Sequence, residues 1–379
     1  MKLRHWLWTL AVCAGSLQAQ EDHTPQFHGF FTQAFTYSGD NNYLGMNSGS
    51  GSLGWTEGAL NVNERVTENL RVGAQIHMTR LGKFGEWTPT LDWALADYKL
   101  KPWLRFRAGK VKIRWGLYND TQDADPGYLW SLLPEPVYAV DFRATNLSQW
   151  GGEAYGNIHL GSRGGELGYS VYHGYYWDAP NDGYMEQFHE SGEYFSKRPG
   201  GITPGFDLRW KTPLTGFTLG GSLMFYDAHG TLVDGSSYQQ PLTFWPTYYA
   251  QYERGKLTLS GQYVRLVQWT DTHAPGAALE SSVVDSRAWF ITAAYHLTDK
   301  LQVGGYYTHY IVAGADLSDP ANRYRDWVVS TRYEFNRFFY SKLEGHWITG
   351  NGVGFYGFDN PNGLASGNKL LVVKLGFCF

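Results

Sequence analysis

The chain has 379 residues, of which 17% are aromatic, 17% are charged and 46 are glycine. The apolar residues are dispersed, and beyond the N-terminus no segment approaches the ~20 consecutive apolar residues of a membrane-spanning helix. The formal net charge of −4 becomes −6 if Lys2 and Arg4 leave with an N-terminal leader. This acidity argues against nucleic acid as a partner.

The N-terminus predicts a cleavable export signal. Residues 1–4 are basic, residues 6–15 are apolar, and a passable cleavage site ends at Ala19. We therefore expect residues 1–19 to be removed and residues 20–379 to form one domain. Cys13 would leave with the leader, and the single remaining cysteine cannot form an intramolecular disulfide.

The rest of the chain predicts β-strands, because apolar and polar residues alternate with a period of two. In residues 70–80, for example, Val72 and Ile76 alternate with Arg71 and Gln75. We expect sixteen strands, at residues 26–38, 53–66, 70–80, 91–101, 104–113, 147–160, 166–178, 205–214, 217–230, 243–254, 257–269, 286–297, 301–314, 323–336, 338–352 and 368–379. Each segment alone would also suit a soluble sheet.

The connections carry the stronger signal, because short and long ones alternate strictly. Short turns, such as residues 67–69 and 215–216, separate strands that are otherwise joined by long loops. The long loops are residues 39–52, 81–90, 114–146, 179–204, 231–242, 270–285, 315–322 and 353–367. Short turns at one rim and long loops at the other are typical of a transmembrane up-and-down antiparallel β-barrel. A soluble sandwich or propeller gives no reason for this alternation.

The last strand has one wholly apolar face, formed by Leu371, Val373, Leu375, Phe377 and Phe379. A strand that stops at a terminal Phe resembles the closing strand of bacterial outer-membrane barrels, whose assembly machinery reads such a C-terminus. The resemblance implies an outer-membrane location, with the surrounding lipid and the barrel-assembly machinery as partners and Phe379 as the assembly signal. We expect this strand to pair with the first one.

Sixteen strands make a cylinder too wide for side chains to fill, so we expect a water-filled lumen lined by polar residues. The alternation places both positive and negative side chains on the inward face. The predicted lining includes Arg71, Arg209, Arg332, Glu334, Lys342, Glu344 and Lys374, together with Asn61, Gln75, Glu153, Asn157, Asp207, Thr292, Gln302 and Asp326.

The predicted strand at 104–113 and its flank are strongly basic, with Arg105, Arg107, Lys110, Lys112 and Arg114. The first two share one face of the strand and the last three share the other. A bulge near Gly109 would bring all five to the lumen, because glycine is common at such kinks. In the alternative reading, Lys110 and the residues after it lie above the membrane and face solvent.

The longest connection, residues 114–146, follows this basic strand and is rich in carboxylates: Asp120, Asp123, Asp125, Glu135 and Asp141. Loops of this length are usually functional. We expect it to fold into the barrel and to oppose the basic strand across a constriction, where a transverse field would sort solutes by charge. The alternative is a surface loop.

The stretch Arg107-Ala-Gly-Lys-Val-Lys-Ile-Arg-Trp-Gly116 resembles the Arg-x-Gly-x-x-Lys-x-x-x-Gly stretch of the phosphate-selective porin O and P-like family. The resemblance implies a trimeric channel of sixteen strands with an inward-folded third loop. The family often has proline before the last glycine, where this chain has Trp115. Because the lumenal lining here is also mixed in sign, general porin function carries over better than phosphate selectivity.

Three functions remain open. The chain could be a passive porin for small hydrophilic solutes, or a substrate-specific channel for anions such as phosphate or for sugars. A sugar pathway would use the inward tyrosines Tyr155, Tyr172, Tyr226, Tyr306 and Tyr310. The third possibility is a barrel enzyme such as a lipid hydrolase, for which we find no catalytic motif. The histidines show no metal-ligand spacing, and we expect no metal or cofactor.

Overall fold

The computed structural model describes residues 24–379, so the predicted leader at 1–19 lies outside the described residues. The regular secondary structure of the described chain is almost entirely β-strand. Its strands are β1 (Gln26–Ser38), β2 (Ser52–Arg65), β3 (Leu70–Leu81), β4 (Thr90–Lys101), β5 (Leu104–Lys112), β6 (Ser148–His159), β7 (Glu166–Trp177), β8 (Phe195–Ile202), β9 (Gly205–Lys211), β10 (Phe217–Leu232), β11 (Ser237–Arg254), β12 (Leu257–His273), β13 (Glu280–His296), β14 (Leu301–Val312), β15 (Arg323–Glu334), β16 (Phe339–Thr349) and β17 (Gly367–Cys378). The helices α1 (Arg143–Asn146) and α2 (Gly183–Glu190) are short, and no helix between residues 24 and 379 could cross a membrane.

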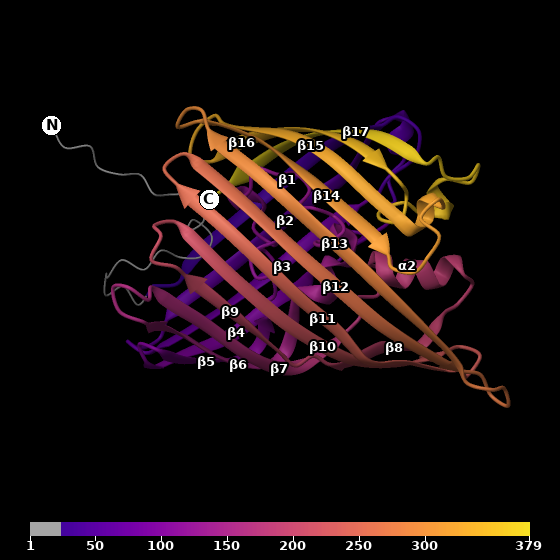
Figure 1. Cartoon of the computed structure of the whole chain (residues 1–379), viewed down its shortest axis with the longest axis horizontal. Coiled ribbons are helices and arrows are strands. Elements are labelled where there is room, and N and C mark those ends of the chain that lie inside the picture. Colours follow the sequence, from indigo (N-terminus) through magenta and orange to yellow (C-terminus); the bar gives the residue numbers. More distant parts are fainter. Residues whose placement is uncertain (1–23) are drawn as a thin grey trace.

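The strands form one closed antiparallel sheet (Figure 1). β1 pairs with β2 on one side and with β17 on the other, from Phe30 opposite Cys378 to Ser38 opposite Leu370. β8 and β9 both lie between β7 and β10, so together they occupy one position in the wall. The break between them falls at Pro204, which has no N–H to donate to the ladder. The wall therefore has sixteen positions, and the prediction of a sixteen-stranded transmembrane barrel is confirmed.

The two rims differ as predicted. Figure 1 shows short turns at the end of the barrel where the C-terminus lies, and longer loops with α2 at the other end. Three predicted long loops are nevertheless partly strand. The loop at 179–204 contains β8, and those at 231–242 and 270–285 shrink to 233–236 and 274–279 because β10 to β13 extend beyond their predicted ends. These extensions are polar, so pairing of the backbone continues there without the apolar alternation that sequence analysis depends on.

The outward face of the barrel is apolar, as a wall in contact with lipid requires. In β17, Leu371 and Leu375 are exposed, whereas Leu370, Val372 and Lys374 on the opposite face are buried. The predicted apolar face of the last strand is thus the outer one.

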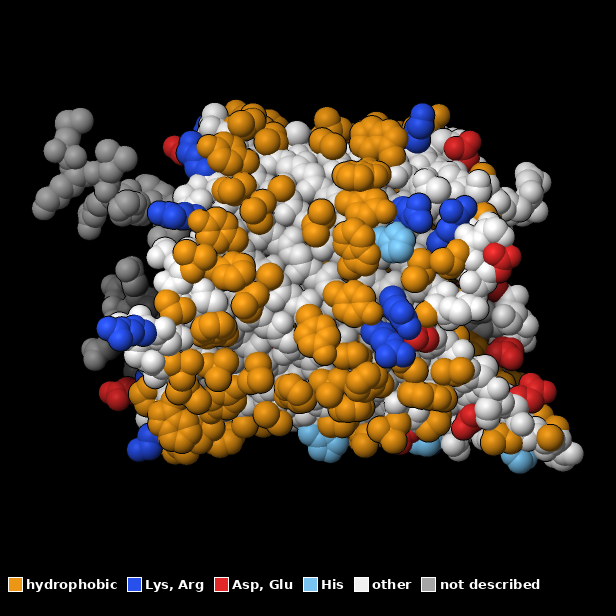
Figure 2. Space-filling model, viewed as in Figure 1, with side chains coloured by type: hydrophobic (Ala, Val, Ile, Leu, Met, Phe, Trp, Pro, Cys, Tyr) orange, Lys and Arg blue, Asp and Glu red, His pale blue; other side chains and the backbone are white. Residues whose placement is uncertain are grey.

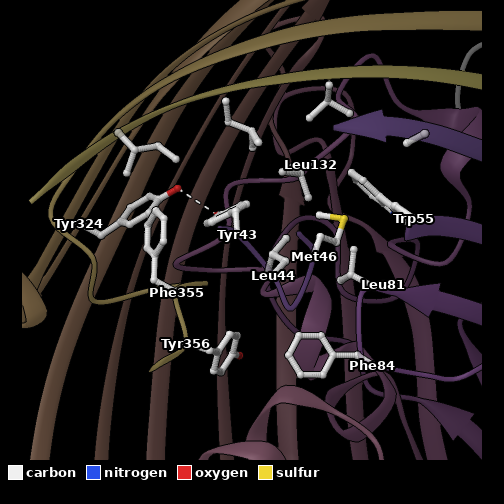
Figure 3. Packing of buried hydrophobic residues seen from close by; sticks show 14 residues of the cluster. Tyr43, Leu44, Met46, Trp55, Leu81, Phe84, Leu132, Tyr324, Phe355 and Tyr356 are labelled. Carbon is white, nitrogen blue, oxygen red and sulfur yellow. Dashed lines mark hydrogen bonds between the residues drawn. The ribbon is translucent and has the colours of Figure 1, made fainter. Parts of the chain in front are cut away.

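Part of the barrel interior is an apolar core, which the expected polar lining did not include. Four loops converge there: Tyr43, Phe84, Leu132 and Phe355 come from different connections and pack with Tyr324 of the wall (Figure 3). The rings of Tyr43 and Phe355 are 4.9 Å apart. The Tyr43 hydroxyl lies 3.2 Å from that of Tyr324. The inward face of this sector is apolar because it is covered by loops instead of water.

The C-terminal residue closes the seam of the barrel. The Phe379 N–H donates to the Gly29 carbonyl at 3.0 Å, and the Gly29 N–H donates back at 3.1 Å. The Phe379 ring lies over Gly29, where an added Cβ would come within 2.8 Å of the ring. Glycine at this position therefore allows the last ring to lie flat on the first strand.

We expect Gly29→Ala to displace the Phe379 ring and to destabilise the folded barrel by about 1–3 kcal/mol, the usual cost of overpacking. The measurement is the temperature at which the folded form is lost on an unboiled detergent gel. Gly39→Ala is the matched control, because its Cβ would meet only ordinary contacts at 3.9 Å in the same strand pair. Equal melting temperatures of the Gly29→Ala and Gly39→Ala variants would contradict a stabilising contact between Phe379 and Gly29.

Candidate functional site

The connection between β5 and β6 folds back inside the barrel. Its two ends are held together where the Ile113 N–H donates to the Leu147 carbonyl at 2.9 Å. The Asn119 side chain also binds the base of the loop, where it donates a hydrogen bond to the Ile113 carbonyl at 2.8 Å. The segment between them is therefore a closed loop with a fixed base.

This loop is hydrogen-bonded to walls on several sides. The Gly116 N–H donates to Ser222 of β10 and the Leu117 N–H donates to Gln262 of β12, each at 2.9 Å. The N–H groups of Ser131 and Leu132 both donate to the Glu344 carboxylate of β16, also at 2.9 Å. Side chains around the barrel thus satisfy backbone groups that the loop would otherwise bury without partners.

The strongest anchor of the loop is Asp125. Its carboxylate lies 3.0 Å from Lys342 Nζ and 2.8 Å from Lys374 Nζ, and it accepts a hydrogen bond from Tyr340 at 2.6 Å. Both lysines are buried and share this carboxylate as their ion-pair partner, and Glu57 adds a longer-range attraction to Lys374. Arg332 adds a hydrogen bond to the Tyr128 carbonyl at 3.1 Å. These wall residues, predicted as general lining, hold the loop.

The basic strand differs from its predicted form. β5 pairs with β4 and β6 without a register shift at Gly109, so the expected bulge is absent. Lys110 pairs with Trp150, which is exposed on the outer face, and its ammonium contacts the Leu91 carbonyl. Lys110 therefore faces outward. Gly109 has a φ of +125° and bends the chain without an extra residue, and Lys112 at the strand end reaches the loop.

Two arginines of β5 form a paired cluster on the inner wall. Asp97 of β4 lies 3.1 Å from Arg105 and 3.2 Å from Arg107. Glu153 of β6 lies 3.1 Å from Arg107. The ring of Tyr155 is 4.2 Å from the Arg107 guanidinium centre. This tyrosine, predicted as a possible sugar contact, supports the arginines instead.

The acidic loop meets the basic strand through its first two carboxylates. Asp123 lies 2.7 Å from Lys112 Nζ. Asp120 lies 3.5 Å from Arg114 and 3.4 Å from Arg209 of β9. The predicted juxtaposition of basic strand and acidic loop is thus present at these residues, as direct contact and not across a gap.

The cations of this network face the lumen and most of the carboxylates lie beneath them. The side chains of Arg105, Arg107, Lys112, Arg114 and Arg209 are between 21% and 30% exposed. Those of Glu153, Asp123 and Asp207 are only 1–2% exposed. We call these five cations the cationic face.

The other predicted site residues lie elsewhere. The Glu135 carboxylate accepts the Val140 N–H at 3.2 Å, and Asp141 is bonded by the Tyr356 hydroxyl. Both are buried within the loops, away from the cationic face. Glu334 pairs with Arg332 at 3.1 Å, and Arg71 pairs across the ladders with Arg65 and Asp97 near the short-turn end.

Sequence reasoning missed two residues of the interior. Arg143 of α1 pairs with Asp92 of β4 at 2.6 Å and fixes the far end of the loop; no local pattern marked it. Asp97 was detectable, because counting back from the short turn at 101–103 places it opposite Arg107. Among the described residues, no group of three or more His, Cys, Asp or Glu is placed to hold a metal ion.

The loop above the barrel docks on this interior through Asp182, the N-cap of α2. Its carboxylate accepts a hydrogen bond from the Thr145 hydroxyl and one from the Met185 N–H at 3.2 Å. Burial raises the pKa of Asp182 from 3.8 to about 7. Burial and the neighbouring Asp182 also raise the pKa of Asp178. Both acids favour their neutral forms in the docked loop.

Comparison with known proteins shows similarity of fold. No protein-family model matches the sequence, and no curated protein matches it. Among solved structures, the trimer form of OmpT, an outer membrane protein of Vibrio cholerae, has a TM-score of 0.56 at 10% identity, covering 94% of this chain and 99% of that one. The outer membrane channel DcaP of Acinetobacter baumannii has a TM-score of 0.54 at 9% identity, covering 94% and 97%. An anion-selective porin from Comamonas acidovorans has a TM-score of 0.53 at 12% identity, covering 94% and 99%.

We expect Asp125→Asn to release the loop from the wall, because it leaves two buried lysines without their ion-pair partner. Breaking a buried ion pair from one side costs roughly 3–5 kcal/mol. Limited proteolysis should then cleave within residues 113–147, and channel conductance should rise. Asp299→Asn, in an exposed turn at the short-turn rim, is the control. Full resistance to protease in the Asp125 variant would show that the other contacts suffice.

We expect docking of the loop at 178–194 to depend on pH through Asp182. Because the docked state raises the pKa of this acid, docking is strongest below about pH 4 and weakens as the pH rises to about 7. The change is on the order of 4 kcal/mol at 1.36 kcal/mol per unit. Hydrogen exchange of this loop, corrected for intrinsic rates, should be faster at pH 8 than at pH 5. Asp182→Asn should reduce the dependence, and Asp178→Asn combined with Asp182→Asn should remove it, because burial raises the pKa of both acids. A dependence that persists in the double variant would assign it to another group.

Proposed function

We propose that the chain forms a water-filled channel for passive diffusion of small hydrophilic solutes across the bacterial outer membrane, with a preference for anions. The observation that carries this proposal is the cationic face, where five half-buried cations are more exposed than most of their carboxylate partners. The fold shared with outer-membrane channels supports the location and the general function. Export through the predicted leader fits the same location.

The cationic face would act through its local field. Interactions in a confined, low-dielectric passage are stronger than in bulk water, so exposed guanidinium groups raise the local concentration of anions. Guanidinium groups also match carboxylate and phosphate oxygens in a bidentate geometry. Because the buried carboxylates neutralise part of the charge, we expect a moderate preference and not exclusive anion passage.

Substrate specificity is the alternative within the same class. The phosphate-selective family resemblance and the arginine cluster favour an anion such as phosphate over a sugar. The proposed sugar pathway is weakened because Tyr172 and Tyr306 are buried and Tyr155 lies beneath arginines. We also propose a homotrimer, assembled by the outer-membrane machinery that reads Phe379; the trimer form of OmpT supports this arrangement by analogy of fold alone.

We expect the purified barrel in a planar bilayer with a salt gradient to give an anion-selective reversal potential. Arg107→Gln combined with Arg209→Gln should lower the anion-to-cation permeability ratio by up to roughly fivefold for each charge removed, since a unit charge at 4 Å in water is worth about 1 kcal/mol. The effect should fade at high salt, because ions screen the face. Lys300→Gln, in an exposed short turn, is the matched control.

The same experiment separates the alternatives. Block of the current by micromolar phosphate would favour a specific anion channel over passive diffusion. A cation-selective wild-type channel would contradict the role of the cationic face. Complete absence of conductance from a folded barrel would sink the channel proposal and favour a barrel enzyme.

A further inference from the structure

The outer wall of the barrel carries a groove that channel function does not require. Its volume is about 670 Å³ and it crosses β11 to β15. The floor is formed by Ala250, Gly261, Ala293 and Gly305, whose small side chains leave the backbone recessed. Trp327 rises beside them and is 63% exposed, while its neighbour Val328 is buried. The groove is therefore on the lipid side of the wall.

Cations follow the groove on the side of the long loops. Two residues beyond Gly261 and Ile291 come Tyr263 and Trp289, and the next outward positions are Arg265 and Arg287, which pair directly across β12 and β13. On β14 and β15, the positions after Tyr307 and Trp327 are His309 and Arg325, which also pair directly. Figure 2 shows the result on this face, with Lys and Arg side chains and a histidine gathered beyond the hydrophobic band, toward the long-loop end.

The arginine pair is only partly neutralised. Asp285 lies 2.9 Å from Arg265 and 3.0 Å from Arg287, so one carboxylate serves two guanidinium groups. Two like charges directly opposite each other in a sheet are unfavourable. In the described part of the chain, the Nε atoms of Arg287 and Arg323 are shielded from solvent and lack an acceptor. Because these two atoms are shielded, the groups open to a ligand are the exposed parts of the Arg265 and Arg287 side chains, which are 42% and 43% exposed.

A row of tilted aromatic rings in mutual contact separates the groove from the cations. The ring centroids of Trp289 and Tyr307 are 5.3 Å apart, those of Tyr307 and Trp327 are 4.6 Å apart, and those of Trp289 and His309 are 5.8 Å apart. Tyr and Trp occupy the boundary between acyl chains and headgroups. Along the wall, the apolar groove is thus followed by the aromatic rings and then by the cations. This order matches that of a phospholipid or glycolipid, in which the acyl chains are followed by the headgroup junction and the phosphate.

We propose that this face binds a phosphorylated, multiply acylated glycolipid of the lipid A type from the outer leaflet. Arg265 on β12 and Arg325 on β15 are three strand spacings and two residues apart, or about 16 Å. That span exceeds one phosphate and suits a headgroup with two. The groove would hold one acyl chain, and the arginines would bind the phosphates through bidentate hydrogen bonds. The inference rests on the proposed outer-membrane location but not on what the channel conducts.

The test uses the full barrel, refolded in detergent without glycolipid, and native mass spectrometry with diphosphorylated lipid A or phosphatidylglycerol. We expect lipid A to bind at least about tenfold more tightly than phosphatidylglycerol. Arg325→Gln and Ala293→Phe, which fills the groove, should each weaken lipid A binding by about tenfold, as loss of a charge-assisted hydrogen bond or of a filled groove predicts. Arg254→Gln, at the opposite rim of β11, should leave binding unchanged.

Equal binding of both lipids, or lipid A binding that neither variant weakens, would overturn the proposal. The proposal would also be overturned if a second copy of the chain occupied the groove. That result would appear as a dimer that Ala293→Phe dissociates. Conductance of both variants should equal that of the wild type, because these side chains face away from the lumen. Absence of conductance in the wild type would refute the proposed channel. It would not decide the lipid proposal, which is tested by the binding measurement.

Discussion

The structure depends on one constraint: inside a bilayer, each backbone N–H and C=O must find a partner within the protein. A sheet can meet this only by joining its first and last strands, which here is the pairing of β1 with β17. Once the sheet is closed, its outer face must be apolar and its termini must meet at one rim. The contact of Phe379 with Gly29 completes the seam where the two edges end.

Closure with sixteen wall positions creates a second requirement, because the cylinder is wider than its own side chains can fill. In this protein the loops fill much of it. An apolar core surrounds Tyr43 and Phe355, and the β5–β6 loop is tied to the wall through Asp125 and Glu344. Charges buried in this way must be paired, so the wall lysines and the loop carboxylate depend on one another. Among the charged groups that join the loop to β5 and β9, the cations are more exposed than most of the carboxylates.

The outer wall shows that the same physics operates on the lipid side. Small residues at Gly261 and Gly305 recess the surface, aromatic rings mark the boundary of the acyl region, and arginines project beyond it. β12 to β15 thus carry small residues, aromatic rings and arginines in succession along their outward face. The inward and outward faces of β12 to β15 can therefore serve separate purposes, since successive side chains point in opposite directions.

The sequence by itself determined the class of fold, the number of wall positions, the two unlike rims and the outward apolar face of the last strand. Those properties follow from local patterns, namely alternation with a period of two and the lengths of connections. It also indicated that the basic strand and the acidic loop belong together. It did not reveal that Lys110 faces outward, that Asp125 bonds to Lys342 and Lys374, or that Asp97 and Arg143 complete the interior networks. Residues as far apart as 125 and 374 meet only because the sheet closes and the loop folds inward. Such contacts depend on the path of the whole chain in space, and no local pattern encodes that path.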